Sequence, residues 1–360
     1  MVIHKKQAWA TGGSATFKSG YLNDRFAIGA TLYTSQPFYA PSGEGGSNIL
    51  TPGQNGYSSL GQIFLEVKLD EHLLASLARK EYDTPFINTD DVRMTPKSFE
   101  GAVIIGTQVN ADTGSQWRYG GGYISKVKGW TSTDFEWMSR VAGAEVDRGV
   151  VVAGASFKNK DFLLGAINYY SNDIINIFYI DTSYKMVISH DNTLKLGVQY
   201  SDQRSTGSNL LIGTPFSTYL AGIKVDLGLG AGLLTLAYTD TSSGANIQTP
   251  WGSSPSYNIV QVEDFSSANE SSVMLRAAYN FTRYGLEGLS ASVLKVYGDG
   301  VKVIGNNKNE TDVDIKWSPP SGTLHGVSFR LRYAHVDWRG SGSPSDLDNV
   351  RLIFGYDFTH

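Results

Sequence analysis

Apolar and polar residues alternate with a period of two through most of this chain, in stretches of about ten residues. Near the C-terminus the apolar members of one such stretch are Val350, Leu352, Phe354, Tyr356 and Phe358. Successive side chains of a β-strand point to opposite faces of the sheet. The pattern therefore predicts a strand with one apolar face and one polar face, and Arg351 on the polar face indicates contact with water.

The same alternation recurs in segments 194–201, 273–281 and 327–334. Their polar positions include Arg276, Arg330 and Arg332. A strand of a transmembrane barrel has roughly 9–11 tilted residues, apolar toward lipid and polar toward the lumen. Because nearly every segment obeys this pattern at similar length, we predict an all-β fold, a transmembrane antiparallel β-barrel.

Tight and long connections alternate along the chain, which is typical of outer-membrane barrels with short turns on one rim and long loops on the other. The tight connections lie near 69–72, 158–161, 189–192, 227–230 and 282–287, and the long ones near 36–57, 82–98, 129–148, 204–215, 241–271, 298–310 and 339–346. Segment 70–80 has helix-like spacing of leucines, but we interpret it as a turn followed by a strand.

Composition agrees with a single barrel. The chain of 360 residues holds 40 glycines and 20 tyrosines, and it has no apolar run of about 18 residues that would form a spanning helix. A soluble chain of this length would usually divide into domains, yet no linker or composition break is present, so we expect one domain over residues 1–360. The lack of cysteine fits export through an oxidising periplasm. The net charge of -4 argues against a nucleic-acid partner, which would need a basic stripe.

The predicted strands number about seventeen, from 7–19 to 349–358. Single-chain bacterial barrels normally have an even number of strands. The opening residues also lack the apolar core of a signal peptide. We therefore expect the chain to begin downstream of its signal and of its first strand.

Several motifs resemble the OprD-type substrate-specific porins, which are eighteen-stranded channels of Gram-negative outer membranes, and the resemblance covers nearly the whole chain. These motifs are residues 9–21 (WATGGSATFKSGY), 84–86 (TPF), 93–96 (RMTP), 99–101 (FEG), 284–289 (YGLEGL), 328–332 (SFRLR) and 350–353 (VRLI). In that family one further strand precedes the segment that corresponds to residues 9–21. A missing first strand matches the odd number of strands predicted here. The family's chains commonly end in an aromatic residue, whereas this one ends in Thr359 and His360.

The resemblance implies an outer-membrane porin for passive diffusion of small carboxylate-containing solutes, such as amino acids and small organic or aromatic acids. A ladder of basic side chains would guide them. Candidate pore residues in the strands are Arg330, Arg332, Arg351, Lys18, Lys316 and Arg276. A low-dielectric wall focuses the field of such charges, and arginine engages carboxylates with two parallel hydrogen bonds. The alternative for each is a structural ion pair with Asp312, Asp314 or Asp348.

The resemblance further implies inward-folded loops near 82–98 and 241–270, with Arg93 in the first and Asp264 in the second. An acid facing basic residues would create a transverse field that favours zwitterionic solutes. Tyr179, on a predicted polar face, is a further pore candidate. The alternatives are an ordinary surface loop and a surface-exposed Asp264.

Two other classes of protein would leave different marks in the sequence. A barrel enzyme of the lipase or protease type would need a positioned base, whereas His335 is expected in an interfacial girdle, and no histidine or cysteine spacing indicates a metal. A ligand-binding β-protein without transport would show polar outer faces. We therefore expect no enzyme activity and no cofactor. The expected partners are the lipid bilayer, small anionic or zwitterionic solutes and the barrel-assembly machinery, with the protein a monomer or a weak trimer.

Overall fold

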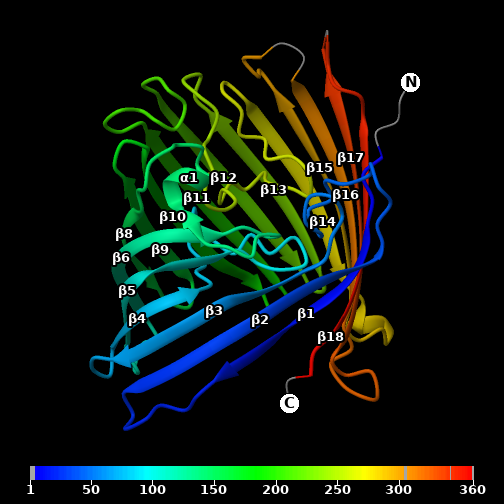
Figure 1. The fold of residues 1–360 in the computed structure, drawn as a ribbon. Helices are drawn as coiled ribbons and strands as arrows, with labels where there is room; N and C mark the ends of the chain where they lie inside the picture. The colour runs from blue at the N-terminus through cyan, green and yellow to red at the C-terminus, as the bar shows by residue number, and fades with distance from the viewer. Residues whose placement is uncertain (1–4, 304–305, 341, 359–360) are drawn as a thin grey trace.

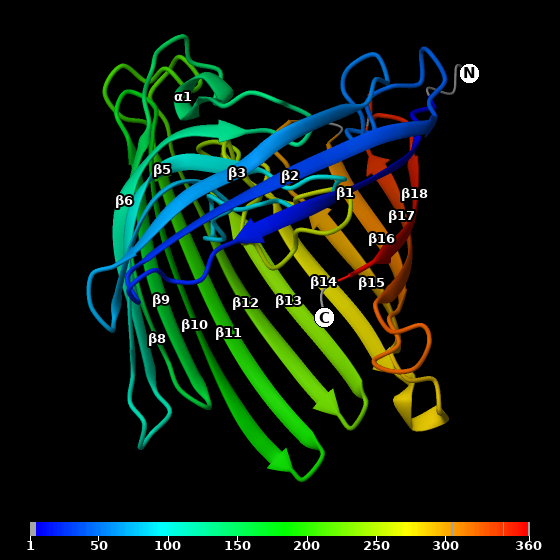
Figure 2. The same ribbon diagram turned by 60° about the horizontal axis from the view of Figure 1, so that its bottom comes forward.

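One antiparallel sheet of 18 strands curls round to form the wall of a barrel (Figures 1 and 2). The structure is a computed structural model and describes residues 5–303, 306–340 and 342–358. The strands are β1 (Trp9–Lys18), β2 (Phe26–Tyr39), β3 (Tyr57–Lys68), β4 (Leu73–Lys80), β5 (Ser98–Val109), β6 (Gln116–Lys128), β7 (Glu136–Trp137), β8 (Val150–Lys158), β9 (Phe162–Ser171), β10 (Ile175–Ser189), β11 (Asn192–Arg204), β12 (Ser217–Leu229), β13 (Gly232–Thr241), β14 (Ser271–Asn280), β15 (Leu289–Asp299), β16 (Asn307–Trp317), β17 (Val327–Arg339) and β18 (Leu347–Tyr356). The predicted fold class is confirmed.

Each long strand pairs with the next one along the chain. The two-residue strand β7 pairs only with β6, which also pairs with β8. Within the described residues β1 pairs with β2 alone and β18 with β17 alone. The sheet is therefore open between β1 and β18, and the strands other than β7 match the predicted number of about seventeen.

Apolar side chains form a continuous band on the outer face of the wall. One row of register partners across five strands consists of Val198, Ile223, Tyr238, Val273 and Tyr297. All five are exposed, by 40% to 55% of their surface. Exposed apolar area on this scale is stable only against lipid.

Polar side chains occupy the inner face at neighbouring positions of the same strands. Thr239 and Ser272 share a hydrogen bond of 2.7 Å between their hydroxyl groups. Asn258, from the connection between β13 and β14, donates to the Ser272 hydroxyl oxygen at 2.8 Å. The alternation seen in the sequence thus separates a lipid face from a lumen face.

Replacing Leu275 with arginine tests the lipid face. Leu275 is 60% exposed and alternates with the inward-facing Arg276. A cation at the bilayer midplane of a barrel destabilises it by roughly 2–4 kcal/mol. We expect urea-dependent unfolding in phospholipid vesicles to show a loss of this size for Leu275→Arg and little loss for Ala278→Arg, whose side chain faces the lumen. Equal losses would contradict the assignment of the faces.

Most long connections and short turns lie on opposite rims, as predicted (Figure 1), although the connection 318–326 on the turn rim is longer than 300–306 on the other rim. The connection between β9 and β10 departs from the alternation, because it spans only residues 172–174 although it belongs to the rim with the long loops. Asp173 there has a φ of 65°, which aspartate tolerates better than most residues. Segment 70–80 forms a turn and then β4, as expected, with Asp70 accepting hydrogen bonds from the backbone of His72 and Leu73.

Helices are few and short. In the part of the chain that the structure describes, they are α1 (Met138–Val141) and the 3₁₀ turn η1 (Phe281–Tyr284). Among the described residues neither is long and apolar enough to cross a membrane.

Candidate pore constriction

Four basic side chains lie together on the inner face of β16, β17 and β18, and we call them the basic track. They are Lys316, Arg330, Arg332 and Arg351. Lys316 is the register partner of Arg330, and Arg332 is the register partner of Arg351. The period of two places them on one face, and the antiparallel pairing places them side by side.

Asp314 is the acid closest to this track. It accepts hydrogen bonds from the Arg330 guanidinium, with Nε 2.9 Å from Oδ1. The Arg332 Nε lies 3.4 Å from Asp314 Oδ2 and makes no hydrogen bond within the described residues. One carboxylate thus stands between two guanidinium groups, and Asp312 and Glu310 on the same face of β16 also attract Arg332.

Arg351 has only uncharged hydrogen-bond partners among the contacts described. Its Nη2 donates to the Gln261 carbonyl oxygen at 3.0 Å, and its Nε donates to Asn349 Oδ1 at 2.9 Å. The first contact joins the wall to the connection between β13 and β14. Arg351 therefore has no ion pair among the described contacts, although Asp312 and Glu310 attract it from β16.

The connection 242–270 lies against the inner wall and is held there by buried carboxylates of β16. Glu310 accepts from the backbone N–H groups of Val262 and Glu263, each at 2.8 Å. Asp312 accepts from the backbone of Gln261 at 3.0 Å. Since Glu310 and Asp312 are 0% and 6% exposed, these bonds are shielded from water, which strengthens them.

The connection 81–97 packs against the opposite part of the wall. Phe86 is 1% exposed and makes edge-on ring contacts with Tyr169 and Tyr179, both with centroids 6.1 Å apart. Asn88 donates to the Ser253 carbonyl oxygen and accepts from the Ser253 backbone, each at 3.0 Å. The two connections thus touch each other across residues 88 and 253.

Arg93 and Asp264 bring further charge to this region. Arg93 stacks over the Trp130 ring at 5.0 Å and lies close enough to Arg351 for the two cations to repel. Asp264 keeps an exposed side chain, but the surrounding protein excludes much of the bulk water and raises its pKa, and the nearby Lys308 opposes that rise. Arg93 therefore lies near Arg351 of the track, and Asp264 lies near Lys308 of β16.

Two predicted pore residues in the strands lie apart from this region. Lys18 Nζ of β1 lies 2.9 Å from Oε2 of the buried Glu66 of β3. The positive charge of Lys18 is therefore balanced by an acid within the wall. Arg276 lies on β14, opposite Thr235 and Leu294 in the register, and β15 lies between it and the track.

Tyr179 is 5% exposed and lies beneath Phe86 of the connection 81–97. It therefore supports that connection from below instead of standing free in the lumen. The alternation in the sequence predicts the inner face for Tyr179, where it lies. It does not reveal that Phe86 covers the Tyr179 ring.

Sequence analysis also missed the anchoring role of Glu310 and of Gln261. A signal for this role is present in β16, where acids occupy alternate positions: Glu310, Asp312 and Asp314. Three carboxylates on one lumen face need hydrogen-bond partners, and a connection folded against the wall can supply them. Asp348, an alternative ion-pair partner for the arginines on sequence grounds, lies on the other face and instead accepts hydrogen bonds from Tyr333 and His335.

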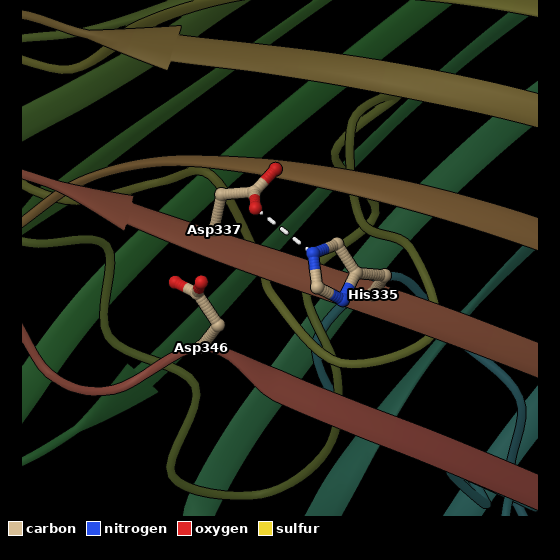
Figure 3. A group of neighbouring side chains, drawn as sticks. All are labelled: His335, Asp337 and Asp346. Atoms are coloured by element: carbon tan, nitrogen blue, oxygen red, sulfur yellow. Dashed lines mark hydrogen bonds and ion pairs between the residues drawn. The ribbon is translucent and has the colours of Figure 1, made fainter.

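Three potential metal ligands lie near the C-terminal end of β17 and just before β18 (Figure 3): His335, Asp337 and Asp346. Their potential ligand atoms lie within 4.8 Å of one another. His335 alternates with the buried Ala334 and Val336, so it faces outward and has no part in the lumen. Both of its ring nitrogens are hydrogen bonded to carboxylates, of Asp337 and Asp348, each at 2.9 Å. These contacts account for the histidine without a bound ion.

The sequence profile described as the outer membrane porin, OprD family, matches residues 3–360. The chain belongs to the OprD family of outer-membrane porins. This OprD-family protein is accordingly a β-barrel of the Gram-negative outer membrane, and its family consists of channels.

Solved structures share its fold at low sequence identity. OpdK of Pseudomonas aeruginosa, crystallised with vanillate, is 20% identical with a TM-score of 0.84, over 97% of this chain and 92% of that one. OccK9 (OpdG) of the same organism is 23% identical with a TM-score of 0.86, over 98% and 91%. A BenF-like porin of Pseudomonas fluorescens is 17% identical with a TM-score of 0.85, over 98% and 91%. Comparison of this OprD-family chain with curated proteins yields no match.

Proposed function

We propose that this porin passes small carboxylate-containing solutes by passive, selective diffusion along the basic track. The observation that carries the proposal is the adjacency of Arg332 and Arg351 on the inner wall, beside the anchored connection 242–270. Neighbouring cations on a low-dielectric wall offer an anion successive sites of similar energy. The vanillate in the OpdK crystal supports the same solute class for this chain.

We further propose that the connections 81–97 and 242–270 form the narrowest part of the pore. Their mutual contact through Asn88 and Ser253, and the attachment of the second to Glu310, support this. Irregular backbone at membrane depth is stable only where it is buried in protein or lines a cavity. The polar contacts of both connections with the wall meet that condition.

Removing two cations of the track tests the solute class. In Arg330→Ala with Arg332→Ala, we expect uptake of a small carboxylate to fall about tenfold or more, because each charge-assisted hydrogen bond contributes roughly 1.5–3 kcal/mol. Uptake of neutral sugars should change little in liposome-swelling assays. The matched control is Arg204→Ala with Arg283→Ala, which removes two arginines outside the track. Equal loss for acids and sugars would refute the basic track.

Asp264 is expected to make the selectivity depend on pH. Exclusion of water raises its pKa above that of an ordinary aspartate, so it gains its proton earlier as the pH falls. The preference for zwitterionic over purely anionic solutes should then decline on mild acidification, by on the order of tenfold for one lost charge. Asp264→Asn should show the low-pH preference already at neutral pH, measured from reversal potentials and solute competition. An unchanged pH profile in this variant would contradict the assignment.

A further inference from the structure

A hollow of about 240 Å³ opens beneath the connection 81–97, between it and the inner faces of β5, β6, β8, β9 and β10. We call it the inner-wall hollow. It is smaller than the roughly 300–1,000 Å³ of pockets for drug-sized ligands, so it has room for a small ring or a short alkyl chain. It lies on a part of the wall that contains no member of the basic track.

Glycines on the inner face create this space. Gly122, Gly154 and Gly165 contribute no side chain to it. A methyl group at Gly122 would lie 2.6 Å from Val103 Cγ1, and one at Gly154 would lie 2.9 Å from Ile167 Cγ1. The nearest atom to each added methyl group would be a backbone carbonyl oxygen of the neighbouring strand, of Ala102 or Ala166, so the close approach of the strands requires glycine at these two positions.

The side chains around the hollow are unusually apolar for the lumen of a porin, which is normally polar and filled with water. Val103, Val152 and Ile167 are only partly buried, and they pack against the core cluster that includes Ile124 and Tyr179. On the lumen face of β13 and β14 the corresponding surface carries hydroxyl groups. Aliphatic surface left facing water lowers stability, so a partner that covers it would explain its presence.

Polar groups stand at the edge of the hollow. Asp83, Arg118, Ser156 and Asp181 belong to its lining. Tyr257, from the connection 242–270, lies close enough to Asp181 for the two side chains to interact. Burial of Tyr257 raises its pKa to about 12, and the negative charge of Asp181 adds to this rise. The edge of the hollow thus lies next to the proposed constriction.

We propose that the inner-wall hollow is a binding subsite for the apolar part of a transported solute. A ring or short chain enters between Val103, Ile167 and Tyr179 while the carboxylate stays in the aqueous pore. The assignment rests on the proposed carboxylate selectivity for the identity of the solute. It adds a second determinant of solute selectivity, the apolar part of the solute, which the basic track does not contact.

Filling the hollow tests this assignment. The added methyl group at Gly165 would meet only Asp181 Oδ1, at 3.0 Å, and Ser156 Cβ, at 3.6 Å, so Gly165→Leu can be accommodated by a shift of the Asp181 side chain. Ser156→Leu fills the same space without changing a glycine. Ser183→Leu is the matched control, because Ser183 lies on the inner face of β10 two residues beyond Asp181 and outside the hollow.

The measurement is the apparent Kd for block of single-channel current by three probes: acetate, benzoate and the neutral benzyl alcohol as a competitor of benzoate. We expect both filled variants to weaken benzoate about tenfold, equivalent to about 1.4 kcal/mol, and to leave acetate unchanged. The Ser183→Leu control should retain benzoate binding. Unchanged benzoate binding in both conducting filled variants would overturn the subsite.

The same probes separate the subsite from the proposed function. If the double variant Arg330→Ala with Arg332→Ala leaves acetate and benzoate unaffected while the filled variants weaken benzoate and benzyl alcohol, the subsite stands and the carboxylate track fails. If the arginine variant weakens both acids while the filled variants weaken neither benzoate nor benzyl alcohol, the track stands and the subsite fails.

Discussion

Glu310→Gln is expected to loosen the connection 242–270 and to open larger conductance levels. The Glu310 carboxylate accepts two backbone hydrogen bonds in a fully buried position. An amide of the same size presents an N–H group to one of these donors and loses that bond. Leaving that buried backbone N–H without a partner costs about 1–3 kcal/mol, which raises the population of the detached connection roughly 5- to 150-fold.

The control for this prediction is Glu287→Gln, which removes a carboxylate of the same type from an exposed turn. Single-channel recordings should show added, larger levels for Glu310→Gln only, and limited proteolysis should cut that variant faster within 242–270. If Glu310→Gln conducts and resists protease like the parent protein, these two hydrogen bonds do not hold the connection in place. Heat-modifiable migration on gels verifies that each variant has folded.

Arg351→Glu is expected to reverse the charge preference of the pore. The change replaces a cation whose described hydrogen-bond partners are uncharged by an anion beside Arg332. At effective dielectric constants of about 20–40 and separations of ~6 Å, one unit charge is worth on the order of 1–3 kcal/mol, and this change removes one positive charge and adds one negative charge. Carboxylate permeation should therefore fall by at least about tenfold.

Arg351→Lys separates charge from shape. Lysine keeps the positive charge but lacks the planar fork that donates to Gln261 and Asn349 at once. Reversal potentials in salt gradients should stay near those of the parent for Arg351→Lys and move toward cation preference for Arg351→Glu. Identical reversal potentials for all three proteins would exclude Arg351 from the permeation path.

The wall of this barrel could be predicted from the sequence because each strand carries its own period-two signal. Arg332 and Arg351 are assigned to the inner face by counting alternate residues, and β4 is distinguished from a helix by the turn that precedes it. Strand propensity and lipid exposure act on each segment alone, so no long-range information is needed.

The contacts of the connections could not be predicted in the same way, since they join residues far apart in the chain. Glu310 bonds the backbone of Val262, and Asn88 bonds Ser253. Lys18 was predicted to face the pore, but whether it is paired depends on Glu66, 48 residues away. The inner-wall hollow is hidden from sequence reasoning for a further reason, because it arises where glycines of neighbouring strands coincide.

The central claim is that the basic track selects carboxylates, and single-channel current in a planar bilayer tests it most directly. Purified protein is recorded with and without benzoate or a small amino acid, and then again as Arg330→Ala with Arg332→Ala. We predict discrete open steps that the carboxylate solute blocks in the parent protein, with the block weakened about tenfold or more in the double variant. Steps that carboxylates fail to block, or block that survives the loss of both arginines, would contradict a carboxylate-selective track.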